Sequence, residues 1–219
     1  MKYYAYISNS KLDMLFPQIP RPFLEDISGE LSVNFGLLKA TLKDKGLTPN
    51  RLSKLNAVAK YIEKYEDVGD MENPATYIKG VGNMHSTILC EGMALFCWCS
   101  ANEKDLEQKH YLLLSGSSSH LIGMDTAEMV YTHSITNIVL NRLAGLRKSE
   151  DALEEKLICE NGNYKQPGHD SYLEDIKHWA SITSGPVQKY EYLARTLIFE
   201  KDGDSNVILA TPIYIALAD

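Results

Sequence analysis

The chain has 219 residues, of which 44% are hydrophobic and 23% charged, and these globular proportions argue against a disordered protein. The net charge is −7, which argues against nucleic acid or an anionic membrane as the main partner. The sequence has no signal segment and no apolar run near the roughly 20 residues of a membrane span, so we expect a cytoplasmic protein with reduced cysteines.

The first third of the chain predicts one strand followed by three helices. Residues 2–8 are rich in tyrosine and end at a polar turn, which is typical of a strand. Apolar residues then recur at helical spacing over 11–19 and 22–31. A third helix is expected over 48–65, capped by Thr48 and ended before a glycine.

The middle of the chain changes to strand character. Strands are expected over 76–81, 92–100 and 110–115, and the last two are predicted to form a hairpin across the charged link 101–109. After the serine turn that follows, residues 120–123 can resume a strand. Further helices are expected over 134–146, 149–159 and 171–182.

The C-terminal segment predicts a second hairpin, with arms 190–200 and 206–216. The spacing of the first arm also fits a helix. The second arm is nearly all apolar, which indicates a strand buried on both faces, with Pro212 at a bulge or an unpaired position. The predicted fold class is therefore α+β, with a largely antiparallel sheet of about five to six strands, helices packed against it, and a single domain over 1–219.

Cysteine and histidine spacing gives no metal signature. Cys97 and Cys99 are two residues apart on a predicted strand, so both should face the same side as buried thiols. No C-x-x-C pair is present, and the histidines outside the serine turn lack H-x-x-x-H or H-E-x-x-H spacing. The sequence predicts no metal site and leaves any cofactor unidentified.

The first candidate site is the junction after the opening strand. Ser8, Ser10 and Lys11 place two hydroxyls and a cation where backbone N–H groups can converge on an anion. The alternative interpretation is structural: Ser10 caps the helix, Asp13 favours the positive end of its dipole, and Lys11 is solvated.

The second candidate site is the serine turn. Gly116 and Ser117 permit close backbone approach to a ligand, and His120 can give or take a proton near neutral pH. The alternative is an ordinary turn capped by the histidine. The serines lack the G-x-S-x-G pattern of a nucleophile elbow.

A third candidate is Arg195, which lies among apolar neighbours in the C-terminal segment. A cation in that setting must pair with an anion or extend to the surface. Glu191 or a ligand phosphate can serve as the partner, and an internal salt bridge to Glu191 is the simpler expectation.

Three stretches together resemble an uncharacterised bacterial family, common in actinomycetes and catalogued as a domain of unknown function. They are YAYISNSKLDMLFPQI over 4–19, SGSSSHLIG over 115–123 and TPIYIALAD over 211–219. The resemblance covers nearly the whole chain, which favours one domain. It implies an accessory protein of bacterial conflict or defence loci, which is an association and not a mechanism.

Three functional hypotheses follow. The preferred one is a ligand-binding or regulatory domain in which Ser8, Ser10, Lys11, Gly116, Ser117, His120 and Arg195 bind a small anionic, nucleotide-like molecule. The second is a hydrolase or transferase with His120 as general base, oriented by Asp13 or Glu191. The third is a protein-interaction module that binds a protein partner or a second copy of the chain.

Overall fold

The computed structural model describes residues 2–30, 50–89, 92–99, 110–123, 169–181 and 187–219. The strands in these ranges are β1 (Tyr4–Ile7), β2 (Val68–Gly69), β3 (Tyr77–Leu89), β4 (Met93–Cys99), β5 (Tyr111–Ser117), β6 (Val187–Asp202) and β7 (Ser205–Leu217). The helices are α1 (Asn9–Leu15), α2 (Arg21–Glu30), α4 (Arg51–Tyr65) and α6 (His169–Ala180), with single 3-10 turns η1 (Phe16–Gln18) and η3 (Ser118–His120).

The sheet closes on itself as a five-stranded barrel. Its hydrogen-bonded order is β1-β7-β5-β4-β3-β2, and β6 pairs with both β3 and β7. Because β6 bridges these two strands, the ring β3-β4-β5-β7-β6 is complete. The β5–β7 and β2–β3 pairings are parallel and the others are antiparallel. The sheet is therefore mixed, seven-stranded and closed, whereas the sequence predicted a largely antiparallel sheet of five to six strands.

Strand β7 lies in the interior of this sheet and pairs with three other strands. One edge pairs with β6 along almost its whole length, while the other pairs first with β5 and then with β1. Its residues 206–216 are all buried, which confirms the expected strand with two covered faces. Leu193 pairs with Tyr214 and Ala194 with Pro212, so Ile213 is an extra residue in a bulge. The bulge next to Pro212 confirms the expected irregularity, since proline cannot donate to the ladder.

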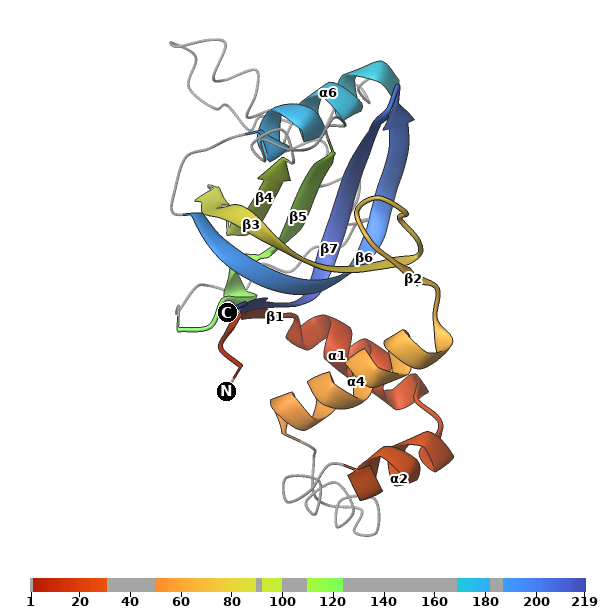
Figure 1. The fold of residues 1–219 in the computed structure, drawn as a ribbon. Coiled ribbons are helices and arrows are strands. Elements are labelled where there is room, and N and C mark those ends of the chain that lie inside the picture. The colour runs from red at the N-terminus through yellow and green to blue at the C-terminus, as the bar shows by residue number, and fades with distance from the viewer. Residues whose placement is uncertain (1, 31–49, 90–91, 100–109, 124–168, 182–186) are drawn as a thin grey trace, which may run out of the picture.

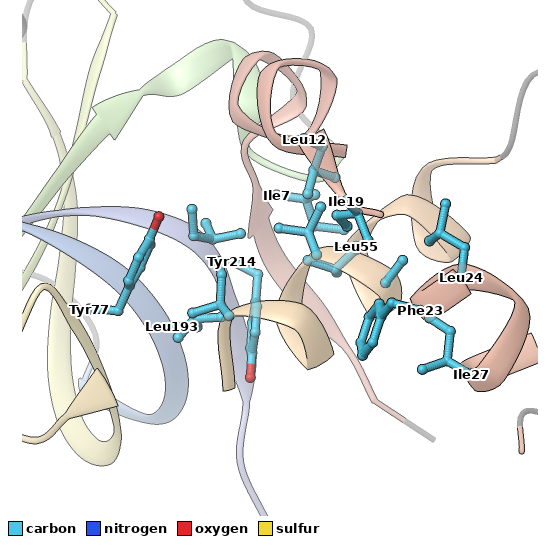
Figure 2. Close-up of a cluster of buried hydrophobic side chains, with 14 of the residues drawn as sticks. Ile7, Leu12, Ile19, Phe23, Leu24, Ile27, Leu55, Tyr77, Leu193 and Tyr214 are labelled. Atoms are coloured by element: carbon cyan, nitrogen blue, oxygen red, sulfur yellow. The ribbon is translucent and has the colours of Figure 1, made fainter. Parts of the chain in front are cut away.

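Helices cover the barrel from two sides. In Figure 1, α6 lies at the top of the molecule and α1, α2 and α4 lie at the bottom, with the strands between them. Figure 2 shows apolar side chains of the three lower helices packed together with Tyr77, Leu193 and Tyr214 of the strands. A second cluster of buried residues fills the barrel, and a third joins α6 to the outward residues of β4, β5 and β7. None of the described helices is long and apolar enough to cross a membrane.

Several local predictions are confirmed and several are corrected. The opening strand, the first three helices, the β4–β5 hairpin, helix α6 and the terminal hairpin lie where the sequence predicted them. The helical alternative for the first terminal arm is wrong, because β6 pairs on both edges. The third helix is capped by the side chain of Asn50, not Thr48. Residues 120–123 form no named strand, and only Leu121 makes a single bridge. The link 101–109 and the helices expected over 134–146 and 149–159 lie outside the described residues.

Candidate functional site

The junction between β1 and α1 is fixed to the rim of the barrel. The backbone N–H of Ser8 donates to the carbonyl oxygen of Ile213, the bulge residue of β7, at 2.9 Å. The Ser8 hydroxyl is the N-cap of α1 and accepts from the N–H of Lys11. Ser8 therefore holds the position that the structural interpretation gave to Ser10, and Ser10 stays exposed in the first turn.

The serine turn reaches this junction through Tyr6. Tyr6 is buried, its backbone bridges to Leu121, and its hydroxyl lies against Gly116. A Cβ at Gly116 would lie 2.2 Å from that hydroxyl, so a glycine is needed for close approach. The ring of Tyr6 lies 5.8 Å from the ring of His120, measured between centroids. Two segments that are far apart in the chain are thus brought into contact.

Hydroxyl groups bind both nitrogens of the His120 ring. The Ser10 hydroxyl lies 3.1 Å from Nε2, and the Ser10 backbone N–H donates to the same nitrogen at 3.4 Å. The Ser119 hydroxyl lies 3.0 Å from Nδ1 and 2.8 Å from the Ser117 hydroxyl. A backbone N–H can only donate, so Nε2 carries the lone pair and Nδ1 carries the proton. The ring is therefore set to accept from Ser10 and to donate to Ser119.

Two cations lie close enough to His120 to act on its charge. Lys11 is partly buried, its amine donates to the Ser8 hydroxyl at 3.3 Å, and burial lowers its pKa to about 8. Arg51, the first residue of α4, donates from one terminal nitrogen to the carbonyl oxygen of Ile7 at 2.6 Å. Burial lowers the pKa of His120 to about 4, and the nearby charges of Lys11 and Arg51 add to that effect, so the ring is neutral at pH 7.

Neither cation is matched by a carboxylate in the described part of the chain. No ion pair there involves Lys11 or Arg51, and the Nε of Arg51 is buried without a hydrogen-bond partner. The nearby acid Asp13 is bound to Lys54 at 2.5 Å. Buried or partly buried charges are normally paired, so an excess of positive charge without an acid is an unusual feature of this junction.

The structure brings together six of the seven residues predicted to bind a ligand, namely Ser8, Ser10, Lys11, Gly116, Ser117 and His120. Arg195 is not among them. It is exposed on β6, paired in register with Tyr77 and Thr211, and its charge acts on Tyr77. The expected salt bridge from Arg195 to Glu191 is also wrong, because Glu191 binds Lys2 and the Tyr214 hydroxyl.

The predicted orienting acids do not contact the histidine. Asp13 and Glu191 bind other partners, and the Nδ1 position is held by Ser119. Sequence reasoning missed Ser119 as a contact and missed Arg51 altogether. Arg51 follows the cap of a helix that begins 40 residues after Lys11, and no local pattern links it to the first strand.

Other polar candidates belong to the packing. Cys97 and Cys99 are buried, and burial raises the pKa of Cys97 to about 12, which confirms the expected core thiols. Trp179 is buried in the cluster that joins α6 to the barrel. Across the described ranges, no group of three or more His, Cys, Asp or Glu side chains could hold a metal ion.

Comparison with known proteins identifies the family of the chain. No curated protein and no solved structure matches it. The model of a family of unknown function, DUF7019, matches residues 2–219, and the expected resemblance to a domain of unknown function is confirmed to that extent. The chain with this serine, histidine and cation cluster at the rim of its barrel belongs to the family of unknown function DUF7019.

Proposed function

We propose that the chain binds a small anionic molecule at the junction of β1 and α1, in contact with Lys11 and Arg51. The observation that carries the proposal is the pair of partly buried cations that lack a carboxylate partner among the described residues. Burying part of a cation without an anion costs free energy, and a bound anion offsets that cost.

The donors at the junction suit a phosphate or carboxylate group. Lys11 offers an ammonium group on a long side chain, and Arg51 offers a planar guanidinium group whose buried Nε has no hydrogen-bond partner, and both kinds of cation bind oxyanions in proteins. The buried Ser8 hydroxyl accepts from the Lys11 amine and so holds this cation at the junction.

The helix itself contributes little to this site. α1 has only seven residues, and Ser8 already caps the N–H of Lys11. The expectation that backbone N–H groups converge on an anion is therefore replaced by one in which side chains supply the charge. A nucleotide-like molecule is included in the proposal because its phosphate is an anion that lysine and arginine side chains bind. A role in regulation or bacterial defence remains an expectation from the family resemblance.

Isothermal titration calorimetry tests the proposal directly. Inorganic phosphate, a nucleoside monophosphate and a nucleoside triphosphate are titrated into the protein at pH 7 and low salt. At least one should release or absorb measurable heat, and Lys11→Ala and Arg51→Ala should each weaken binding about 10- to 100-fold, the value of one charge-assisted hydrogen bond.

Arg195→Ala is the matched control, because it removes the same charge from an exposed residue outside the cluster. It should leave the dissociation constant within about twofold of the wild type, since exposed charges contribute little at a distance. The proposal is overturned if no anion gives heat, or if Arg195→Ala weakens binding as much as Arg51→Ala does.

A further inference from the structure

The contact between Ser10 and His120 has the geometry of an activated hydroxyl. The Ser10 hydroxyl is 3.1 Å from Nε2, and the backbone N–H of Ser10 requires that nitrogen to be an acceptor. The proton of the Ser10 hydroxyl can therefore point at Nε2. A nucleophile within hydrogen-bond reach of a base is the signature of covalent catalysis by serine.

The ring of His120 is also oriented from its far side. Nδ1–H donates to the Ser119 hydroxyl at 3.0 Å, and Ser119 contacts Ser117 at 2.8 Å. This places a hydroxyl where serine hydrolases have a carboxylate. A hydroxyl fixes the tautomer but supplies no charge to stabilise an imidazolium, so another anion is needed when the ring takes a proton.

A bound substrate can provide that anion. Lys11 and Arg51 both disfavour the protonated form of His120 in the empty site. A negatively charged group lying between these cations would offset their effect on the ring. The histidine would then become a stronger base only when an anionic substrate is present, which would link catalysis to the charge of the substrate.

We propose that Ser10 is a nucleophile, with His120 as its general base, for carboxylic esters that carry a negative charge bound by Lys11 and Arg51. This inference rests on the proposed anion site and names the reaction and substrate class for it. The buried Ser8 is a cap and a donor, whereas Ser10 is exposed to an incoming ester.

The reaction balances without any further reactant. The Ser10 oxygen forms a bond to the ester carbonyl carbon, its proton passes to Nε2, and the carbonyl π pair becomes an oxyanion. Collapse breaks the bond to the alkoxide, which takes the proton from Nε2 and leaves as an alcohol. Water then attacks the acyl-serine, gives a proton to Nε2, and releases the carboxylic acid as Ser10 recovers its proton.

Labelling by a fluorophosphonate probe tests the nucleophile. Its phosphorus should bond to the Ser10 oxygen as the P–F bond breaks and HF is lost, and peptide mass spectrometry should locate the adduct at Ser10. Ser10→Ala should abolish the adduct, and His120→Gln should slow labelling at least about 100-fold, the lower bound for loss of a general base. An adduct on another serine, or labelling of His120→Gln at the wild-type rate, overturns the proposal.

Ester hydrolysis tests the substrate class. The 4-nitrophenyl hemiester of adipate, which is anionic, should be cleaved by the protein at least about 10-fold faster than neutral 4-nitrophenyl hexanoate, after the rate without protein is subtracted, which is the factor expected from one charge-assisted contact. Arg51→Ala should remove that preference and Arg195→Ala should keep it. Phosphate binding by calorimetry without labelling would refute the nucleophile and leave the proposed anion site standing, whereas labelling with equal rates for both esters and no phosphate binding would refute the anion site.

Discussion

Two lysines at opposite ends of the molecule have opposite electrostatic settings. Lys177 on α6 lies between Glu174, at 2.7 Å, and Asp202, and these two carboxylates raise its pKa. Among the described residues, the Lys11 amine on α1 is hydrogen-bonded to a serine oxygen and to no carboxylate, and burial lowers its pKa to about 8. Both lysines belong to helices packed on the same barrel, and yet within the described structure only Lys177 is neutralised.

The difference separates a cation that is paired within the fold from one that has no carboxylate partner among the described residues. The pairing of Lys177 joins α6 to the β6–β7 turn and contributes to the fold. The burial of the Lys11 amine costs stability, and its hydrogen bond to the Ser8 hydroxyl supplies no negative charge to offset that cost, which is a pattern common at functional sites. Four predictions test this contrast between the α1 side and the α6 side of the molecule, and they follow in order of decreasing effect on the free energy of unfolding.

Gly116→Ala should disrupt the α1 side of the molecule and leave the α6 side intact. The added Cβ would lie 2.2 Å from the hydroxyl of buried Tyr6, so Tyr6 or the strand must shift, at a cost of about 3 kcal/mol in the free energy of unfolding. Urea denaturation measures this. Gly203→Ala is the control: it meets no neighbour within 4 Å but has a φ of +60°, and should cost about 1 kcal/mol. Equal costs would contradict the close packing at Gly116.

The pH dependence of stability should reveal the neutral histidine. The pKa of His120 is about 4 in the folded chain and near 6.5 when unfolded, so the unfolded chain binds an extra proton between these values. Stability should therefore be lost as pH falls from 6.5 to 4, by about 2 to 3 kcal/mol in total. Denaturation curves for wild type and His120→Gln across this window measure the effect, and the variant should lack that part of the loss. Parallel curves would mean that His120 titrates normally.

Lys11→Met should stabilise the folded chain while removing anion binding. It replaces a partly buried cation with an apolar side chain of similar length, which should add about 1 to 2 kcal/mol at pH 7. The wild type regains stability as pH rises from about 8 to 10.5, because the unfolded chain then holds a proton that the folded chain has released. The difference between the two proteins should shrink over that range. A destabilised Lys11→Met would show that the lysine supports the fold.

Lys177→Met should destabilise the folded chain, and its effect on the free energy of unfolding should be the smallest of the four. It leaves Glu174 and Asp202 without their shared cation, and a surface ion pair of this kind contributes about 0.5 to 1 kcal/mol. Thermal unfolding in low salt and in about 1 M salt provides the measurement, and the loss should be smaller in high salt because the charges are screened. A stabilising effect from this substitution would remove the contrast between the two lysines.

Local patterns in the sequence predicted which side chains meet at the β1–α1 junction more completely than they predicted the sheet. The β1–α1 junction and the serine turn are each recognisable from a few neighbouring residues, and both supply the expected side chains. Closure of the barrel depends on the β5–β7 and β3–β6 pairings, which join distant segments and leave no local signal. Arg51 was missed for the same reason, since it reaches Ile7 only through the packing of α4 against α1.

The direction of the Arg195 side chain could not be predicted because the secondary structure of its segment was ambiguous. The spacing of the apolar residues around Arg195 fits both a helix and a strand. The two structures place the Arg195 side chain on different faces of the segment. In the strand β6, Ala194 belongs to the cluster inside the barrel and Arg195 is exposed. Alternation along a strand therefore places the arginine on the outside, where it can reach solvent. The segment had to be identified as a strand or as a helix before the direction of the Arg195 side chain could be predicted.

The hydrogen bond from Ser8 to Ile213 has a consequence for the order of folding. It attaches the candidate site near the start of the chain to a strand near its end, so the contacts of the site have a very high contact order and should form late. Refolding experiments should therefore recover helical signal from α4 before they recover ligand affinity. The proposed anion site would then be complete only when the last β-pairing has formed.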